Sequence, residues 1–255
     1  MTSPRSPQTP RAATKPTPPR QTAWVIFAAV VVVALGLATW HFVPLLSPLG
    51  AAQGYCSDLT QQHYQQMYQQ RLSATLRVQV SEQAFTGAEQ LADQQAGRVT
   101  QCDTSLLATA LDGNTAVAHV TERRASGITV ATDLHLSGQN WQIVALPDPA
   151  IMPFAVAQQF CDALSGQLYD QAYHLLATAI TASLTQDRYT ALQQFADQTN
   201  GTVTTCTISQ LALTTNTATA TVQVQRQHGP TGGMRVQIQL SPQAGTWLIT
   251  NLPTA

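Results

Sequence analysis

Charged side chains are scarce in this sequence. They make up 10% of its 255 residues, against about a quarter in typical soluble proteins, and Lys15 is the only lysine. Gln and Thr provide much of the polar surface instead. Phosphate groups are held by clusters of Lys and Arg that release counterions, so a chain with so little basic surface is not expected to bind nucleic acid.

The sequence also lacks the residue patterns that mark common catalytic and metal sites. It has no C-x-x-C motif, no histidine at metal-ligand spacing from a cysteine, and no serine-hydrolase pattern. We therefore expect no catalytic residue, no cofactor and no metal ion. On this basis the chain is predicted not to be an enzyme.

Residues 1–22 form a proline-rich segment with little apolar surface to bury. The segment carries Arg5, Arg11, Lys15 and Arg20 and no acidic residue, which gives it a charge of +4. Prolines lack a backbone donor and interrupt regular structure. The composition therefore predicts a disordered tail.

Residues 23–43 form an apolar segment without a charged side chain. At about 1.5 Å per residue, a helix of this length spans the roughly 30 Å hydrocarbon core of a membrane. Trp24 and Trp40 lie near its ends, where indoles favour the interface, and Pro44 ends the helix. We predict one transmembrane helix over 23–43, followed by a linker over 44–53.

The distribution of charge predicts the orientation of this helix. The other 8 basic and 13 acidic residues follow it, and 8 − 13 = −5 contrasts with +4 in the tail. The positive-inside rule then places the N-terminus in the cytoplasm and everything after Pro44 outside, in a single-pass cell-membrane protein. A signal peptide cleaved near residues 50–52 is an alternative, although the length of the segment favours an uncleaved signal anchor.

The remainder of the chain is one unit that occurs twice. Residues of the first copy that recur in the second include cysteines, a carboxylate, a glycine and a tryptophan: Cys56 as Cys161, Asp93 as Asp197, Gly97 as Gly201, Cys102 as Cys206, and Trp141 as Trp247. With two long copies this is a pair of domains rather than a solenoid. We predict domain boundaries at 54–148 and 149–255.

Each copy begins with helical periodicity. Apolar residues at steps of three and four predict a first helix whose buried stripe is Cys56, Leu59, His63 and Met67 in the first copy, and Phe154, Ala157, Phe160, Cys161, Leu164 and Leu168 in the second. A shorter helical stretch follows. A third helix is then predicted, with Ser81 or Thr185 as its N-cap and Gly97 or Gly201 just past its end.

The third helix has its own predicted apolar face, and strands come after it. The face consists of Phe85, Ala88, Leu91 and Ala92 in the first copy, and of Tyr189, Leu192, Phe195 and Ala196 in the second. Beyond it the apolar period changes to two, as in residues 203–213, 218–226, 234–240 and 247–252. Helices followed by an antiparallel meander predict an α+β fold, with the helices on one face of a curved sheet.

The four cysteines are predicted to form two structural disulfides. They lie after the predicted membrane segment, one pair per copy, where an oxidising environment favours disulfides. Four cysteines allow three connectivities. The symmetry of the copies selects Cys56–Cys102 and Cys161–Cys206.

Three short motifs recur in both copies and point to a family. They are an aromatic residue before the first cysteine (Tyr55-Cys56, Phe160-Cys161), a Gly-x-Val-x-x-Cys motif (97–102, 201–206), and Trp-x-Ile near the end (141–143, 247–249). Together they resemble the NTF2-like superfamily, also called cystatin-like or ketosteroid-isomerase-like, and are similar to its bacterial membrane-anchored members. The resemblance covers residues 54–255 and implies a cone of helices and curved sheet, open as a pocket in enzymes and filled in binding modules.

A pocket in the cone would draw on side chains of the first helices. The resemblance makes His63 a candidate pocket residue, and the phenols of Tyr64, Tyr68, Tyr169 and Tyr173 are candidates too. A single histidine on an apolar face is also typical of ordinary packing. Asp93 and Asp197 lie near a helix end in both copies, a position that favours a bond to a turn over a role as a base.

These observations favour a single-pass, extracytoplasmic binding or scaffolding protein with two disulfide-linked NTF2-like domains. Its expected partners are the membrane and one or more proteins at the cell surface. One alternative is a bitopic subunit of an envelope complex similar to conjugation or type IV secretion systems. Another is a small-ligand carrier or enzyme that uses the cone of a domain.

Overall fold

The computed structural model describes residues 47–111, 113–230 and 232–252. The predicted tail (1–22), the predicted transmembrane helix (23–43) and the start of the linker (44–46) lie outside the described residues. Among the helices that the structure does describe, none is both long enough and apolar enough to cross a membrane. Membrane insertion, orientation and cleavage therefore stay predictions.

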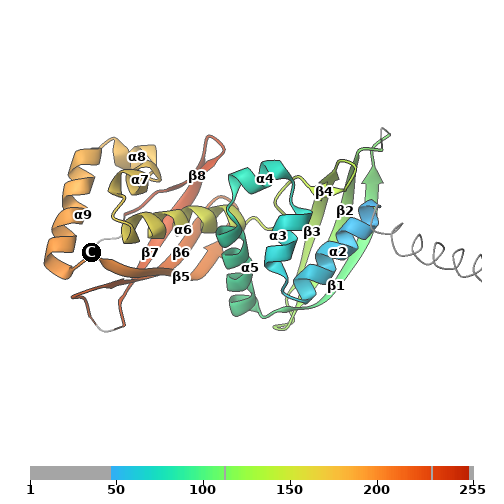
Figure 1. Cartoon of the computed structure of the whole chain (residues 1–255), viewed down its shortest axis with the longest axis horizontal. Coiled ribbons are helices and arrows are strands. Elements are labelled where there is room, and N and C mark those ends of the chain that lie inside the picture. The colour runs from blue at the N-terminus through green and yellow to red at the C-terminus, as the bar shows by residue number, and fades with distance from the viewer. Residues whose placement is uncertain (1–46, 112, 231, 253–255) are drawn as a thin grey trace, which may run out of the picture. The chain divides into compact units, whose positions relative to one another are not determined.

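Two four-stranded antiparallel sheets form the β layers (Figure 1). The strands of the first are β1 (Val99–Thr109), β2 (Thr115–Arg124), β3 (Thr129–Ser137) and β4 (Gln142–Ile143), and those of the second are β5 (Val203–Leu213), β6 (Ala218–Arg226), β7 (Met234–Gln243) and β8 (Thr246–Ile249). Strands that are consecutive in the chain are neighbours in each sheet, so both sheets are meanders. The predicted α+β class is confirmed.

Four helices precede each sheet. In the first repeat they are α2 (Pro48–Thr60), α3 (Tyr64–Arg71), α4 (Ala74–Gln79) and α5 (Glu82–Ala96), and in the second α6 (Ile151–Ser165), α7 (Tyr169–His174), α8 (Thr178–Thr181) and α9 (Gln186–Asn200). We use "first repeat" for α2 to β4 and "second repeat" for α6 to β8. The single short helical stretch that the sequence predicts between the first and third helices is two short helices in both repeats.

The predicted ends of the third helix are confirmed in both repeats. The hydroxyl of Ser81 accepts a hydrogen bond from the Ala84 amide at 3.2 Å, and that of Thr185 accepts one from the Arg188 amide at 3.4 Å. Side-chain acceptors at the N-cap satisfy amides that have no partner within the helix. Gly97, with a φ of 76°, follows the last turn of α5 and there adopts a backbone that favours glycine.

A separate apolar core lies between the helices and the sheet of each repeat. Alternate residues of β2 and β6 face the helices, because side chains along a strand point to opposite faces. The largest fully buried side chains are Leu59, Met67, Leu72, Phe85, Leu134, Leu136 and Ile143 in the first repeat, and Ile151, Tyr189, Ile238, Leu240 and Ile249 in the second. Apart from Ile151, these side chains fill the space between the helices and the sheet of their own repeat.

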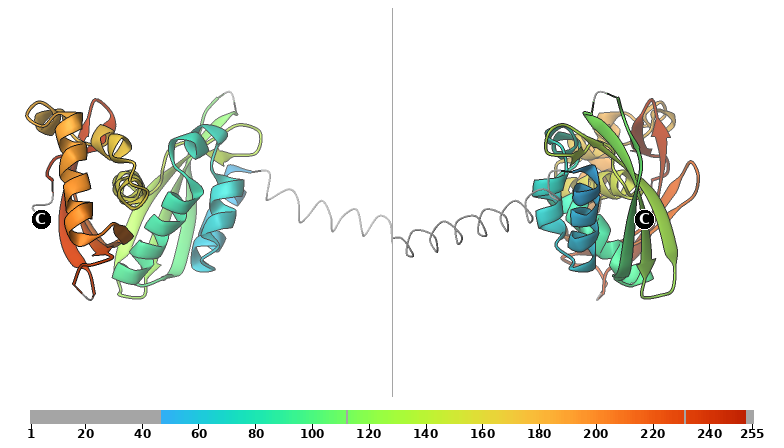
Figure 2. Two further views of the ribbon diagram at one scale, coloured as in Figure 1. Left: turned by 60° about the vertical axis from the view of Figure 1, so that its left-hand side comes forward. Right: turned by 90° about the vertical axis from the view of Figure 1, so that its right-hand side faces the viewer.

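The start of α6 belongs to the core of the first repeat. Ile151, Phe154 and Ala155 are buried together with residues of α2, α5 and β2. Figures 1 and 2 show α6 beside α5, the helix on which its first turns pack. The predicted domain boundary at 148/149 thus precedes a segment that both cores use, and the boundary itself remains a prediction.

The first helix of each repeat ends earlier than the apolar stripe predicts. Gln62 and Gln167 have φ angles of 59° and 56°, a left-handed conformation that turns the chain after α2 and α6. His63 and Leu168 lie beyond this turn and are exposed. Their predicted burial on the helix stripe is therefore wrong, because the helix that would carry them stops first.

The predicted buried face of the third helix is correct in the first repeat, whereas in the second repeat only Tyr189 of that face is buried. On α5, Ala88 and Leu91 are 3% and 4% exposed, whereas on α9 Leu192 and Phe195 are 52% and 67% exposed. The difference in exposure between the two helices comes from tertiary packing. The first turns of α6 cover α5, and no helix of the described region packs on α9 in the same way.

Candidate functional site

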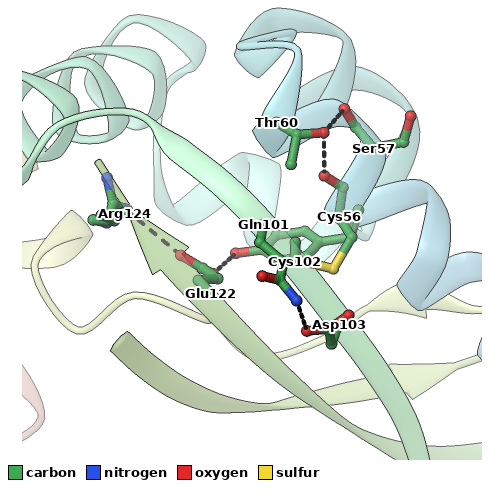
Figure 3. The surroundings of a disulfide bond; sticks show 9 residues. Cys56, Ser57, Thr60, Gln101, Cys102, Asp103, Glu122 and Arg124 are labelled. Carbon is green, nitrogen blue, oxygen red and sulfur yellow. Dashed lines mark hydrogen bonds and ion pairs between the residues drawn. A yellow bond between two sulfur atoms is a disulfide. The ribbon is translucent and has the colours of Figure 1, made fainter. Parts of the chain in front are cut away.

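The two predicted disulfides are present, and they join the same elements in both repeats. Cys56 of α2 is bonded to Cys102 of β1, and Cys161 of α6 is bonded to Cys206 of β5. The Cα atoms are 5.4 and 5.2 Å apart. Each bond fixes the first helix to the edge strand of its sheet, as Figure 3 shows for Cys56 and Cys102. In the described region all cysteines are thereby accounted for.

Tyr64, Asp93 and Arg124 form a polar cluster in the first repeat. The phenol of Tyr64 donates to Asp93, and Arg124 Nη1 donates to Asp93 Oδ1 at 3.0 Å. Arg124 also donates to the carbonyl of Gly97 at 3.4 Å, just past the end of α5. The cluster thus ties α3, the end of α5 and β2 together.

The second repeat contains the same cluster. The phenol of Tyr169 donates to Asp197, and Arg226 Nη1 donates to Asp197 Oδ1 at 2.6 Å and to the Gly201 carbonyl at 2.9 Å. Burial and the bond to Asp197 raise the pKa of Tyr169, so its phenol remains a donor. Because both copies keep this arrangement at the same place, we assign it a structural role. The prediction that Asp93 and Asp197 bind a turn misses their arginine and tyrosine partners.

The other candidate pocket residues do not converge on one cavity. The Tyr68 phenol donates to the carbonyls of Arg77 and Val80 at 3.0 and 2.9 Å. The Tyr173 phenol donates to the Leu184 carbonyl at 2.9 Å. These bonds hold the short helices in place, while His63 is an exposed N-cap residue of α3.

A pocket of about 690 Å³ lies along α7 and α9 of the second repeat. Tyr169 and Asp197 are among its lining residues, together with Asp170, Asp187 and several Gln and Thr side chains. Tyr169 is thus the one candidate of the second repeat that lines this pocket. The pocket borders the outside of α9 and does not involve the concave face of the sheet.

Two buried carboxyls of the first repeat lie near a half-buried carboxyl of the segment that follows it, a group that the second repeat lacks. We call Glu89, Glu122 and Asp148, with the phenol of Tyr55, the carboxyl cluster. Tyr55 and Glu89 are each 2% exposed, and Glu122 is 6% exposed. The Tyr55 phenol donates to Glu122 Oε1 at 3.4 Å, and Arg124 Nη2 lies 3.6 Å from Glu122 Oε2. Figure 3 shows Glu122 and Arg124 together on β2, near the disulfide.

Glu89 is the least satisfied member of the carboxyl cluster. Its Oε1 has no hydrogen-bond partner within the described part of the chain. Burial raises the pKa of Glu89 well above its ordinary value, and the charges of Asp148 and Glu122 raise it further. Burial likewise raises the pKa values of Glu122 and Asp148. The proton affinity of the cluster is therefore much higher than that of exposed carboxyls.

The position of Asp148 connects this cluster to the second repeat. Its Oδ1 accepts a hydrogen bond from the Ala150 amide at 2.7 Å, immediately before α6 begins. Half-buried itself, Asp148 lies close enough to raise the pKa of Glu89 through its charge. A carboxyl with a raised pKa is suited to proton transfer, but Glu89 and Glu122 are closed off from solvent in this conformation. We therefore expect their environment to affect the stability of the fold rather than a reaction.

Sequence reasoning missed the carboxyl cluster, although comparing the copies could have found it. Each member has a non-ionisable counterpart in the second copy: Tyr55 matches Phe160, Glu89 matches Gln193, Glu122 matches Val224, and Asp148 matches Thr254. For Glu122 the strand register supports the match, because Cys102 pairs with Glu122 as Cys206 pairs with Val224. The signal is a set of ionisable residues that differ together between otherwise similar copies.

Replacing Glu89 with Gln, its counterpart in the second copy, should stabilise the protein increasingly as the pH rises. Above pH 4.5, the ordinary pKa of this carboxyl, the folded state holds the Glu89 proton more tightly than the unfolded state does. The stability of the wild type therefore falls as pH rises towards the raised pKa. At pH 8 we expect a gain of about 1–3 kcal/mol for Glu89→Gln, measured by urea unfolding.

A matched control is Glu82→Gln on the same helix. Glu82 lies in the first turn of α5 and is half-buried, with an oxygen that accepts from the Gln69 amide at 2.9 Å. The free energy of unfolding of the Glu82→Gln variant should stay within about 0.5 kcal/mol of that of the wild type at each pH. A curve of unfolding free energy against pH for Glu89→Gln that runs parallel to the wild-type curve between pH 4.5 and 8 would show that Glu89 does not titrate abnormally.

Neither a scan of protein-family models nor a comparison with curated protein sequences finds a match to this chain.

Proposed function

We propose that this chain is a single-pass, membrane-anchored, extracytoplasmic binding or scaffolding protein with two NTF2-like domains. The observation that carries the proposal is that the residues that hold the fold occur in both repeats, whereas the buried glutamates occur in only one. Both repeats keep the disulfide and the Tyr–Asp–Arg cluster, which hold the fold. The buried ionisable groups that differ between them are closed to solvent. Two copies of one stable unit suit the display of a surface.

The disulfides support the extracytoplasmic location. Disulfides persist in oxidising compartments and are rare where thiol reductants are abundant. Both described pairs join residues that follow the apolar segment, and the basic tail precedes it. A cytoplasmic tail, one transmembrane helix and an oxidised outer part are consistent with all these observations.

The filled interiors support binding rather than catalysis in the cone. The order of elements, with helices first and a four-stranded meander after them, agrees with the NTF2-like resemblance. Phe85, Leu134 and Leu136 are at most 1% exposed on the concave side of the first sheet, and Ile238, Leu240 and Ile249 are equally buried in the second. Aliphatic and aromatic side chains therefore occupy most of the space in which an enzyme of this superfamily would hold its substrate, and in the first repeat they share it with the buried Glu122.

The outer faces of the sheets offer the surface for a partner. In the second sheet Thr205, Thr207, Gln237 and Gln239 are exposed, next to buried residues that face the helices. Neutral hydrogen-bonding groups of this kind suit a protein or cell-wall partner and do not attract polyanions. We propose that such a partner lies at the cell surface.

The location can be tested by protease accessibility in intact spheroplasts that express the full chain with an epitope at each end. We expect the C-terminal epitope to be lost when protease is added outside and the N-terminal epitope to survive until the cells are lysed. The chain should also stay in the pellet after extraction with alkaline carbonate. Loss of both epitopes, or release of the whole chain by carbonate, would contradict a cytoplasmic tail and a membrane anchor.

The same membranes test the binding role. The full chain, purified in mild detergent, should retain another extracytoplasmic component in a fixed ratio. A variant with Thr205→Glu and Gln237→Glu changes the outer face of the second sheet without touching its core, and it should lose that component. Equal retention by wild type and variant would exclude this face, and recovery of the chain with no other component would contradict a binding role.

A further inference from the structure

The contact between the two repeats has two sides, and the elements that form each side have equivalents in the other repeat. One side is α5, where Gly87 lies under Phe154: a Cβ atom at Gly87 would approach the Phe154 ring to 2.8 Å. The other side consists of the first turns of α6 and part of β5, whose Ile208 and Leu211 pack against the core of the first repeat. We call these the helix side and the edge side. Since the unit is duplicated, each side has a second copy elsewhere in the chain.

The second copy of the helix side is the open face of α9. Counting from the equivalent Asp93 and Asp197, the counterparts of Gly87, Ala88 and Leu91 are Ala191, Leu192 and Phe195. Leu192 and Phe195 are 52% and 67% exposed, although the residues they replace are buried. Large apolar side chains at this exposure, three residues apart on a helix, form an apolar stripe on its surface.

The second copy of the edge side is the open end of the first repeat, made by α2 and β1. Counting from the equivalent Cys56 and Cys161, the counterpart of Phe154 is Leu49, at the start of α2. The strand register makes Leu106 the counterpart of Leu211, because they pair with the equivalent Ala118 and Ala220. Leu106 is 43% exposed and its neighbour Leu107 is 57% exposed. The exposed apolar surface of this end therefore lies on β1, beside Leu49, which is half-buried.

The two open sides have complementary side-chain volumes at the position equivalent to the close contact between Phe154 and Gly87. Within the chain the large Phe154 meets Gly87, which has no side chain. Between the open sides the smaller Leu49 would meet the larger Ala191. The two exchanges offset each other in volume, as tight packing between helices requires. In addition, α2 carries no charged residue before Asp58, so covering the part of its first turns that is still accessible desolvates no charge.

We propose that copies of this chain associate head to tail, with α9 of one copy packed on α2 and β1 of the next in the manner of the contact between the repeats. The occupant of the α9 face is thus a second copy of this chain, because the chain itself carries the matching side. Figures 1 and 2 show α9 and α2 at opposite ends of the described region. A contact between different faces at opposite ends leaves both outer faces free and extends into a row or closes into a ring.

A symmetric contact between two α9 helices is the competing arrangement. It would cover Leu192 and Phe195 but leave Leu106 and Leu107 exposed, whereas the head-to-tail contact covers both sets. The arrangements differ in a measurable way. In a symmetric dimer only changes on α9 matter, and in a head-to-tail assembly changes at either end matter.

Sedimentation of the full chain in non-ionic detergent tests the proposal with one variant for each side. Leu192→Asp places a charge in the α9 face, and Leu106→Asp places one in the α2–β1 end. The wild type should form oligomers whose mass rises with concentration, and each variant alone should be monomeric. An equimolar mixture of the two variants should give dimers and nothing larger, because each variant keeps the side that the other has lost.

The matched control is Gln194→Asp, which adds the same charge to α9 at the position whose counterpart in the first repeat, Gln90, stays exposed beside the contact. It should assemble like the wild type. All three positions are exposed, so intact disulfides and an unchanged circular dichroism spectrum are expected as evidence of folding. A monomeric wild type would overturn the proposal, and so would a Leu106→Asp variant that still dimerises by itself.

A photo-crosslinking amino acid in place of Phe195 provides a test that needs no destabilising charge. In membranes that contain the full chain, crosslinked peptides should come from residues 47–60 or 99–109 of another copy. The same amino acid at Gln194 should give no such product. Crosslinks to residues 186–200 of another copy would establish the symmetric arrangement instead, and crosslinks only to lipid or to a different protein would exclude self-assembly through this face.

Discussion

Replacing Arg124 with Met should lower the free energy of unfolding by about 3–5 kcal/mol at pH 7. The Arg124 side chain is 7% exposed, and its guanidinium lies 3.0 Å from Asp93 and 3.6 Å from Glu122. Its charge also lowers the pKa of Glu89, opposing the larger effect of burial. Met fills a similar volume but removes the positive charge, which leaves buried carboxylates without compensation. Chemical unfolding followed by tryptophan fluorescence would measure the loss.

The second repeat contains the matched control, Arg226→Met. Arg226 and Asp197 are 15% and 13% exposed, and the buried glutamates beside Arg124 have non-ionisable counterparts there. We expect this variant to lose only about 1–2 kcal/mol, because water screens the pair and a single carboxylate is left unpaired. Equal losses in the two repeats would mean that the arginine–aspartate pair alone accounts for the effect and that the carboxyl cluster contributes nothing.

The pH dependence of the two variants separates these explanations further. Burial raises the pKa values of the carboxyls of the cluster, so as the pH falls they become neutral at a higher pH than exposed carboxyls do. A neutral carboxyl needs no cation, so the loss caused by Arg124→Met should shrink at pH 5. The loss caused by Arg226→Met should change less over the same range. A constant loss for both variants would contradict the charge-based account.

Much of the fold could be predicted because it depends on local rules or on the duplication. Ser81 and Thr185 were identifiable as N-caps from their positions before the apolar helix residues, and both act as such. The pairing of the four cysteines followed from their equivalent places in the two copies. Neither inference requires knowledge of which elements pack together.

The features that could not be predicted depend on contacts between distant parts of the chain. Leu91 and Phe195 occupy the same place in similar helices, yet one is 4% and the other 67% exposed. What differs is the presence of α6, which follows the first repeat and covers α5. In the same way Glu89 looks like an ordinary polar residue of a surface helix, and only its tertiary surroundings make it a buried acid.

Local backbone geometry explains the misplacement of His63. Its spacing from Cys56 and Leu59 continues the apolar period of a helix, so periodicity alone assigns it to the stripe. The chain instead turns at Gln62, whose left-handed conformation is uncommon for a residue other than glycine. The same turn occurs at Gln167 in the second repeat. Its recurrence indicates that the turn is a property of the unit, although neither glutamine marks it in the sequence.

Removing either disulfide by replacing both of its cysteines with Ala should lower the free energy of unfolding by about 2–4 kcal/mol. Alanine leaves no buried thiol or hydroxyl without a partner. The bonds close loops with sequence separations of 46 and 45 residues. Because loop-closure entropy depends on the logarithm of loop length, the two double variants should lose nearly equal amounts. Urea unfolding under non-reducing conditions measures both losses, and the wild type in reductant provides the control with both bonds open.

The quadruple variant then decides whether the repeats unfold as one unit. If the repeats are energetically independent, each pair of substitutions affects its own transition and the losses add. The first turns of α6 lie in the core of the first repeat, while Cys161 of the same helix holds the second. We therefore expect the quadruple variant to deviate from additivity by at least 0.5 kcal/mol. Strict additivity with two separate transitions would instead mean that α6 divides into halves that act independently, and that a boundary near residue 148 separates two autonomous domains.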